Sequence, residues 1–166
     1  MMGWKNDLKE WMRIVPGVAG HQDREAIRER DRVVRLSLVS ELQGCGRGLE
    51  KIKPALDALI EKKELGLLQG IDYLSVKIDK LGNLIRYAGQ NDRGRFDPWS
   101  IDPLEQLLAF DEDLFVEVES IKEQVHALEA AIDDPERLNR EMHQVDRALD
   151  QLEKTFSIRC GLFMQR

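Results

Sequence analysis

The sequence has few of the residues that support secreted, membrane-spanning or strand-rich proteins. It contains two cysteines in 166 residues. Cys45 and Cys160 lie far apart, so no disulfide framework is predicted and both are expected as thiols in a reducing cytoplasm. No apolar run approaches the roughly 18 residues of a membrane-spanning helix. Thr occurs once and Ser six times, and β-branched residues form no alternating runs, so strands are not expected.

The abundant residues favour one soluble helical domain. Hydrophobic residues make up 42% and charged residues 34% of the chain, and Leu, Glu, Ala, Lys and Arg dominate, as in all-α proteins. The first 16 residues carry several charges instead of the apolar segment of a signal peptide. These features predict a cytoplasmic protein, with a peripheral position at the inner membrane face left open by the N-terminal segment described below.

The net charge of −6 is unevenly distributed. Residues 1–100 carry a small positive excess, whereas residues 101–132 carry nine acids and a single lysine. A nucleic-acid-binding protein is therefore not expected, because it needs a concentrated basic face. The one basic concentration, residues 24–35, is interleaved with acids, and we interpret it as a solvated helix face with internal ion pairs; a local anion or partner site is the alternative.

Hydrophobic periodicity divides the chain into three parts. Residues 1–15 are predicted to form an amphipathic leader helix, residues 16–22 a Pro/Gly linker, and residues 23–160 a single helical-bundle domain. Apolar seams at 3-4 spacing predict an antiparallel bundle of coiled-coil type, with four main helices after the leader helix.

Capping residues, glycine and proline set the expected ends of those helices. The first runs from an N-cap at Asp23 to about residue 63, and is expected to be kinked or broken between residues 44 and 54, where three glycines and Pro54 occur. Residues 64–70 are expected as a turn. The second helix is predicted over about 71–88. The third is predicted from an N-cap at Asp102 to about residue 132, and the fourth begins after a cap at Asp133 or Asp134.

No catalytic, cofactor or metal site is predicted. A carboxylate-bridged dimetal bundle needs two Glu-x-x-His pairs, and the chain has one, Glu123 with His126. The glycines at 44, 46 and 48 lack the Lys-Ser/Thr of a phosphate-binding loop. Neither cysteine has a neighbouring histidine that would make it a nucleophile.

Two segments are candidate interaction sites. The leader helix carries Trp4, Leu8 and Trp11 on one face; this face either packs on the bundle or docks onto a partner or a membrane surface. The connection over residues 88–101 is long for a bundle, and long loops are often functional. Either it covers the bundle end or it contacts a partner, and its candidate side chains are Arg93, Arg95, Phe96 and Trp99.

Short motifs in both halves of the chain resemble those of an uncharacterised group of bacterial helical proteins. They are Val15-Pro16-Gly17 with Gly20, Asp23-Arg24-Glu25, Arg28-Glu29-Arg30-Asp31, Ile85-Arg86-Tyr87-Ala88 and Gly94-Arg95-Phe96-Asp97. The resemblance implies a helical fold and no particular activity. The order of leader helix, linker and helical hairpin is also similar to that of the phage-shock membrane-remodelling coiled-coil proteins.

The sequence therefore predicts a non-enzymatic adaptor or scaffold that acts through protein–protein interaction or self-association. Two alternatives remain open: a peripheral membrane protein that uses the leader helix, and a degenerate ferritin-like metal-binding bundle. No small-molecule substrate is indicated.

Overall fold

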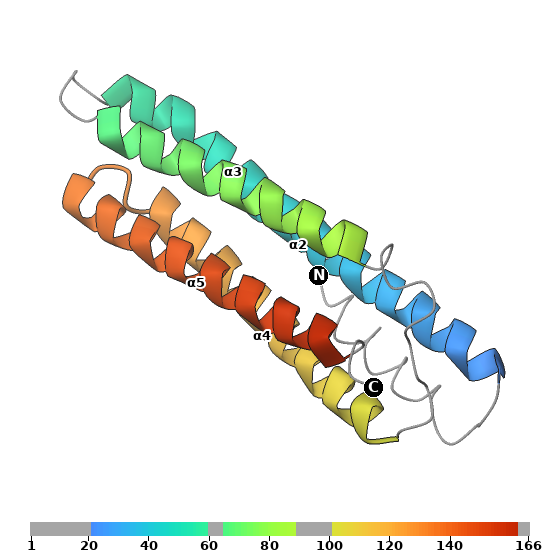
Figure 1. Ribbon diagram of the computed structural model, residues 1–166. Coiled ribbons are helices and arrows are strands. Elements are labelled where there is room, and N and C mark those ends of the chain that lie inside the picture. The colour runs from blue at the N-terminus through green and yellow to red at the C-terminus, as the bar shows by residue number, and fades with distance from the viewer. Residues whose placement is uncertain (1–20, 60–64, 89–100, 163–166) are drawn as a thin grey trace.

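The protein is an all-α bundle (Figure 1). The computed structural model describes residues 21–59, 65–88 and 101–162, and the side chains of 29–58, 65–88 and 109–160. No strand occurs within these ranges. The helices, labelled as in Figure 1, are α2 (His21–Leu59), α3 (Leu65–Tyr87), α4 (Ile101–Glu129) and α5 (Pro135–Leu162). This confirms the predicted fold class.

The four helices form two hairpins that pack side by side. Each hairpin consists of helices adjacent in sequence, α2 with α3 and α4 with α5. The hairpins meet through α2 against α4 and α3 against α5, so α3 and α4 lie diagonally across the bundle (Figure 1). A connection between diagonal helices must be longer than one between neighbours. The 89–100 segment therefore joins two helices that are not neighbours in the bundle.

The core is formed by the seams that periodicity predicts. Along α3 and α5, every predicted seam residue within the described side chains is buried. They are Ile71, Leu74, Ile78, Leu81 and Ile85 of α3, and Leu138, Met142, Val145, Leu149, Leu152 and Phe156 of α5. The side chains share one face because residues three and four apart lie over one another on a helix.

The break expected in α2 does not occur, because the helix is continuous from His21 to Leu59. Pro54 costs one backbone hydrogen bond, but the buried side chains of Ile52 and Leu56 hold the helix on both sides of it. Gly48 admits a neighbouring helix: a Cβ atom built there would lie 2.8 Å from Cγ1 of Val125 on α4. Burial of the seam thus outweighs the low helix propensity of this segment.

Two glycines of α2 should respond in opposite ways to alanine. Gly48→Ala should destabilise the protein by about 1–2 kcal/mol, because the stiff Val125 side chain must move. Gly46→Ala should stabilise it by about 0.5–1 kcal/mol, since its Cβ would lie 3.7 Å from Ile78, an ordinary contact, and alanine favours the helix. Urea unfolding of both variants measures the difference. Equal gains in stability would show that α2 and α4 are not in close contact at Gly48.

The other helix boundaries differ by small amounts from those expected. The predicted turn over 64–70 is wrong, because α3 already begins at Leu65. Gly70 favours this continuation, since it lets Met142 of α5 approach closely. α2 starts at His21, inside the expected linker, and α4 ends at Glu129 rather than 132. The cap of α5 is confirmed: the backbone N–H of Arg137 donates to Oδ1 of Asp134, with Pro135 as the first helical residue.

Candidate functional site

The interaction residues predicted from sequence lie outside the described part of the chain, and they stay predictions. They are Trp4, Leu8 and Trp11 of the leader segment, and Arg93, Arg95, Phe96 and Trp99 of the long connection. The described residues contain two other features that stand out: a buried cluster of charges and an exposed apolar face on α3.

The charge cluster joins all four helices. Arg159 of α5 is buried and donates to two carboxylates, from Nε to Asp111 of α4 at 2.5 Å and from Nη1 to Asp31 of α2 at 2.7 Å. Arg30 donates to the other oxygen of Asp111 at 3.1 Å. Arg35 donates to Asp31 at 2.8 Å and to the backbone carbonyl of residue 86, at the end of α3, at 2.8 Å.

The cluster corrects the interpretation of residues 24–35 as a solvated face. Arg32 does form an exposed pair with Glu29, as that interpretation expects. Arg30 and Arg35, however, are buried and pair with the cluster. The cluster lies beside the end of α3, where Arg35 donates to the backbone carbonyl of residue 86. Charged side chains replace apolar ones on the seams at this level.

Electrostatics within the cluster favour a structural role. Burial raises the pKa of the Asp111 carboxyl, and the guanidinium groups of Arg159 and Arg30 oppose that rise. Burial lowers the pKa of Arg30, whose interaction with Asp111 favours the charged form. Three guanidinium groups thus pair with two carboxyl groups inside the bundle. Removing one partner of such a set leaves a buried charge uncompensated.

The described side chains offer little that could perform catalysis or bind a metal. Burial raises the pKa of the Cys45 thiol to about 11, which suppresses the nucleophilic thiolate. Glu123 and His126, the Glu-x-x-His pair, both lie on the surface. Throughout the described ranges, no three side chains of His, Cys, Asp or Glu come together as a metal site requires.

α3 exposes a second apolar face, opposite its core seam. Eight large hydrophobic side chains are exposed within the described residues, and five of them belong to α3. Four form a stripe, which we call the outer stripe: Tyr73 (56% exposed), Val76 (66%), Leu84 (45%) and Tyr87 (50%). At 3.6 residues per turn, these four side chains point on average roughly 140° away from the buried seam. A helix that is apolar on both faces is normally covered on both.

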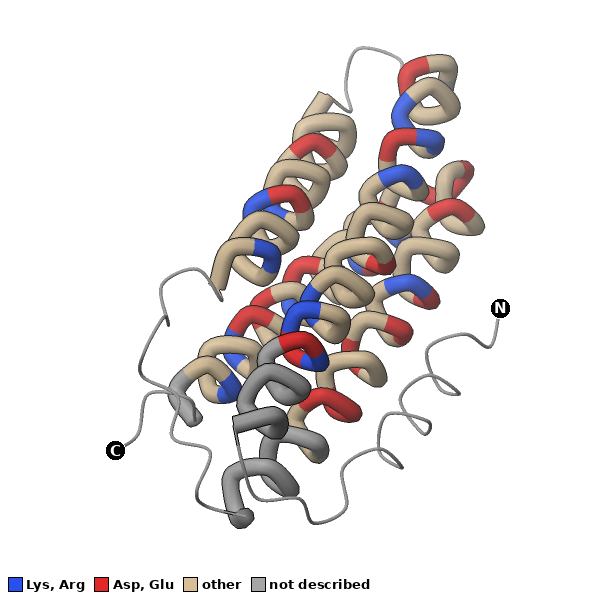
Figure 2. Tube along the Cα trace, turned by 90° about the vertical axis from the view of Figure 1, so that its right-hand side faces the viewer, with Lys and Arg blue, Asp and Glu red and all other residues tan. Residues whose placement is uncertain are grey.

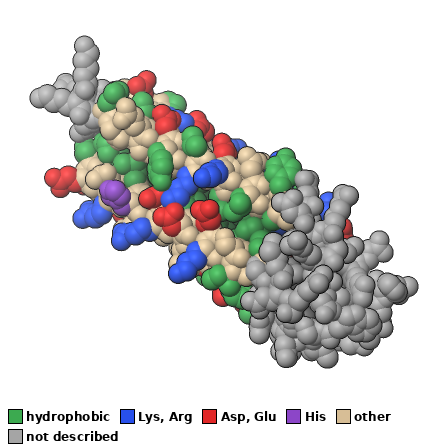
Figure 3. Space-filling view, in the orientation of Figure 1, with side chains coloured by type: hydrophobic (Ala, Val, Ile, Leu, Met, Phe, Trp, Pro, Cys, Tyr) green, Lys and Arg blue, Asp and Glu red, His purple; other side chains and the backbone are tan. Residues whose placement is uncertain are grey.

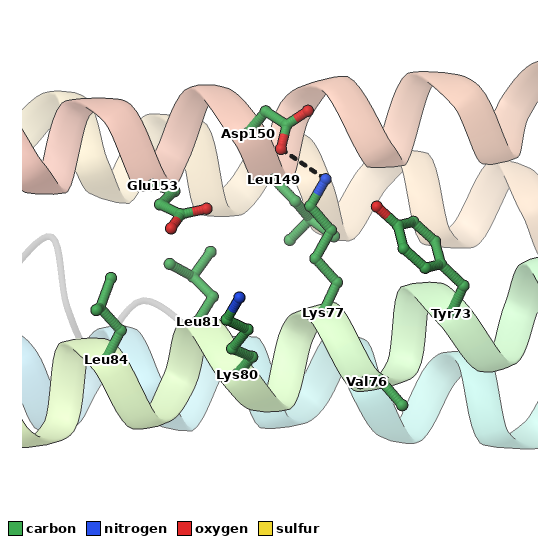
Figure 4. A pocket seen from close by; sticks show the side chains of 9 residues that line it. All are labelled: Tyr73, Val76, Lys77, Lys80, Leu81, Leu84, Leu149, Asp150 and Glu153. Carbon is green, nitrogen blue, oxygen red and sulfur yellow. Dashed lines mark ion pairs between the residues drawn. The ribbon is translucent and has the colours of Figure 1, made fainter.

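A groove borders the outer stripe on the side of α5. Its volume is about 520 Å³. Figure 4 shows its lining: Tyr73, Val76, Lys77, Lys80, Leu81 and Leu84 of α3, and Leu149, Asp150 and Glu153 of α5. Figure 3 shows hydrophobic side chains exposed among charged ones on the molecular face that includes α3 and α5.

Lys77 bridges this groove. Its Nζ lies 2.5 Å from Oδ1 of Asp146 and 2.6 Å from Oδ1 of Asp150. Partial burial lowers the pKa of Lys77, but the hydrogen bonds that its ammonium group donates to the two carboxylates outweigh burial and raise the pKa overall. These pairs link α3, which carries the outer stripe, to α5.

The rest of the described surface is mixed in charge. Figure 2 shows basic and acidic residues interspersed along the described parts of α2, α3 and α5, whereas the charged residues of α4 over 109–129 are acidic except for Lys122. None of the described helices is long and apolar enough to cross a membrane. The outer stripe is therefore the feature of this surface that most resembles a contact site for another molecule.

Comparison of the chain with family models, with curated proteins and with solved structures gives no match.

Proposed function

We propose that the protein is a non-enzymatic helical adaptor or scaffold, and that it contacts its protein partner through the outer stripe of α3. The observation that carries the proposal is the apolar second face of that helix, with Tyr73 and Val76 each more than half exposed. Moving a large apolar side chain from water into a contact contributes about 1.5–3 kcal/mol. The stripe is thus a substantial source of binding free energy.

The chemistry of the stripe supports a protein partner. Tyrosine is enriched at protein interfaces, because it combines a large apolar ring with a polar hydroxyl. Tyr73 and Tyr87 stand at the two ends of the stripe, with Val76 and Leu84 between them. Each tyrosine is three positions from an aliphatic residue, Tyr73 from Val76 and Tyr87 from Leu84. Apolar pairs at this spacing are also found where one helix packs against another.

Site-specific photo-cross-linking in cells tests the proposal. A photo-reactive amino acid replaces Tyr73 or Leu84, and Val116 of α4, which is 58% exposed, provides the control position. We expect discrete protein adducts from the two α3 positions and none from position 116. A second copy of the chain counts as a partner in this experiment.

Two results would contradict the proposal. Absence of adducts at both α3 positions would leave the stripe without a partner. Flotation of the protein with anionic liposomes, abolished by Trp4→Ala with Trp11→Ala, would favour the membrane-associated alternative instead.

A further inference from the structure

The outer stripe has a mirror order along the chain. Reading outward from Lys80, the stripe has an aliphatic residue four positions away on each side, Val76 and Leu84. It has a tyrosine seven positions away on each side, Tyr73 and Tyr87. All five fall on one face of α3, because the spacings of three and four residues keep a helical face in register.

From this order we infer that the outer stripe binds a second copy of the same chain, with the two α3 helices antiparallel and a twofold axis passing beside Lys80. The inference rests on the proposed function and names the partner. A twofold contact is self-complementary, so that residue i meets residue j and j meets i. Antiparallel pairing about Lys80 places Tyr73 against Tyr87 of the second copy and Val76 against its Leu84.

The charges at the centre suit such an axis. The two Lys80 ammonium groups meet near the axis, where alone they would repel each other. Glu153 of α5 lines the same groove as Lys80 in each copy (Figure 4). With the α5 helices on the same side of the α3 pair, each ammonium lies between two Glu153 carboxylates. Lys77 is already held by Asp146 and Asp150, which leaves Lys80 for the contact.

The area favours a reversible dimer. Burying the exposed parts of the two tyrosines, Val76 and Leu84 in both copies removes on the order of 1,000 Å² of accessible surface, near the lower limit of specific interfaces. A lysine at the centre of a helix pair lowers affinity and specifies its register. The dimer should therefore dissociate on dilution rather than be permanent.

Cysteine cross-linking tests the register. Lys80→Cys should form a covalent dimer under mild oxidation, because position 80 faces itself at the axis and a disulfide needs Cα atoms within about 7 Å. Val76→Cys alone should form no covalent dimer, because position 76 of the second copy lies eight residues away along the helix, about 12 Å. A mixture of Val76→Cys and Leu84→Cys chains should form the mixed dimer. Wild-type protein, which retains Cys45 and Cys160, gives the background.

Sedimentation at several concentrations tests the affinity. Val76→Glu with Leu84→Glu should weaken the dimer at least tenfold, and Lys80→Leu should strengthen it at least tenfold. Val116→Glu, on an exposed position of α4, should leave it unchanged. Circular dichroism checks that each variant is folded.

Three outcomes would overturn the inference. In the first, wild-type protein stays monomeric at all concentrations. In the second, every cysteine position cross-links with itself, as in a parallel pair. In the third, the Val116 variant and the α3 variants change the dimer affinity equally. If photo-cross-linking captures a different protein at Tyr73 while the purified chain is monomeric, the dimer is excluded and the proposed function stands. If photo-cross-linking gives no adduct and the purified chain is monomeric, both the dimer and the proposed function are excluded.

Discussion

Replacing Asp111 with asparagine should destabilise the protein by about 3–5 kcal/mol, the range for a buried ion pair that loses one partner. Asparagine preserves the size of the side chain, so the loss measures charge rather than a cavity. The change leaves Arg30 and Arg159 buried with one carboxylate fewer, since both guanidinium groups donate to Asp111. Against a typical total stability of about 5–15 kcal/mol, this is a large fraction.

Chemical denaturation of matched variants checks this prediction. Asp113→Asn, on an exposed position of the same helix, should change stability by less than about 0.5 kcal/mol. In the double variant Asp111→Asn with Arg159→Gln, the loss should be smaller than the sum of the two single losses, because the second change removes one uncompensated charge. A single Asp111→Asn variant as stable as wild type would mean that this carboxylate contributes no net stabilisation.

Replacing Leu149 with alanine should cost about 2–5 kcal/mol, the range for removing a large side chain from a packed core. Leu149 is fully buried in the middle of α5, below the groove between α5 and α3. The bundle has helices on both sides of this position, so the resulting cavity cannot collapse without moving a backbone. The loss therefore contains a cavity contribution as well as the lost hydrophobic transfer.

Ile158→Ala on the same helix is the matched control, because Ile158 is 48% exposed. It should cost less than about 1 kcal/mol, so the two variants separate burial from helix propensity. If the dependence of the unfolding free energy on urea concentration has the same slope for both variants as for wild type, the difference between them is one of native-state stability. Similar losses for both variants would contradict the position of the seam on α5.

The core could be predicted from sequence because its signal is local. Periodicity places Leu149 and Leu152 on one face without knowledge of any neighbour. The continuity of α2 could not be predicted in this way. At Gly48 and Pro54 local propensity disfavours the helix, and burial of the α2 seam against α3 and α4 reverses the balance.

The charge cluster has a signature in the sequence, in the form of charged residues at seam positions. Asp111 stands between Leu107 and Leu114 at spacings of four and three, and Arg159 follows Phe156 by three. With Asp31, which also falls on a seam, three helices carry a charge at a core position. Opposite charges on different seams could have indicated a buried pairing, but only the topology shows that they lie at the same end.

The outer stripe was missed for a different reason. Once the core seam of α3 is assigned through Ile71 and Ile78, the remaining residues are expected to be solvated. Tyr73, Val76, Leu84 and Tyr87 are scattered among polar residues in the linear sequence. Their significance depends on the structure, which leaves this face of α3 uncovered by any described helix.

The pairing of helices that are adjacent in sequence also determines how the chain can fold. Within each hairpin, contacts close short segments, which favours rapid formation of α2 with α3 and of α4 with α5. The step that joins the halves must close the 89–100 connection, and doubling such a loop costs only about 0.6 kcal/mol in entropy. The chain is therefore expected to fold by docking of two hairpins that have already formed, α2 with α3 and α4 with α5. The Arg159–Asp31 pair, 128 residues apart, forms in that last step and fixes how far one hairpin slides along the other.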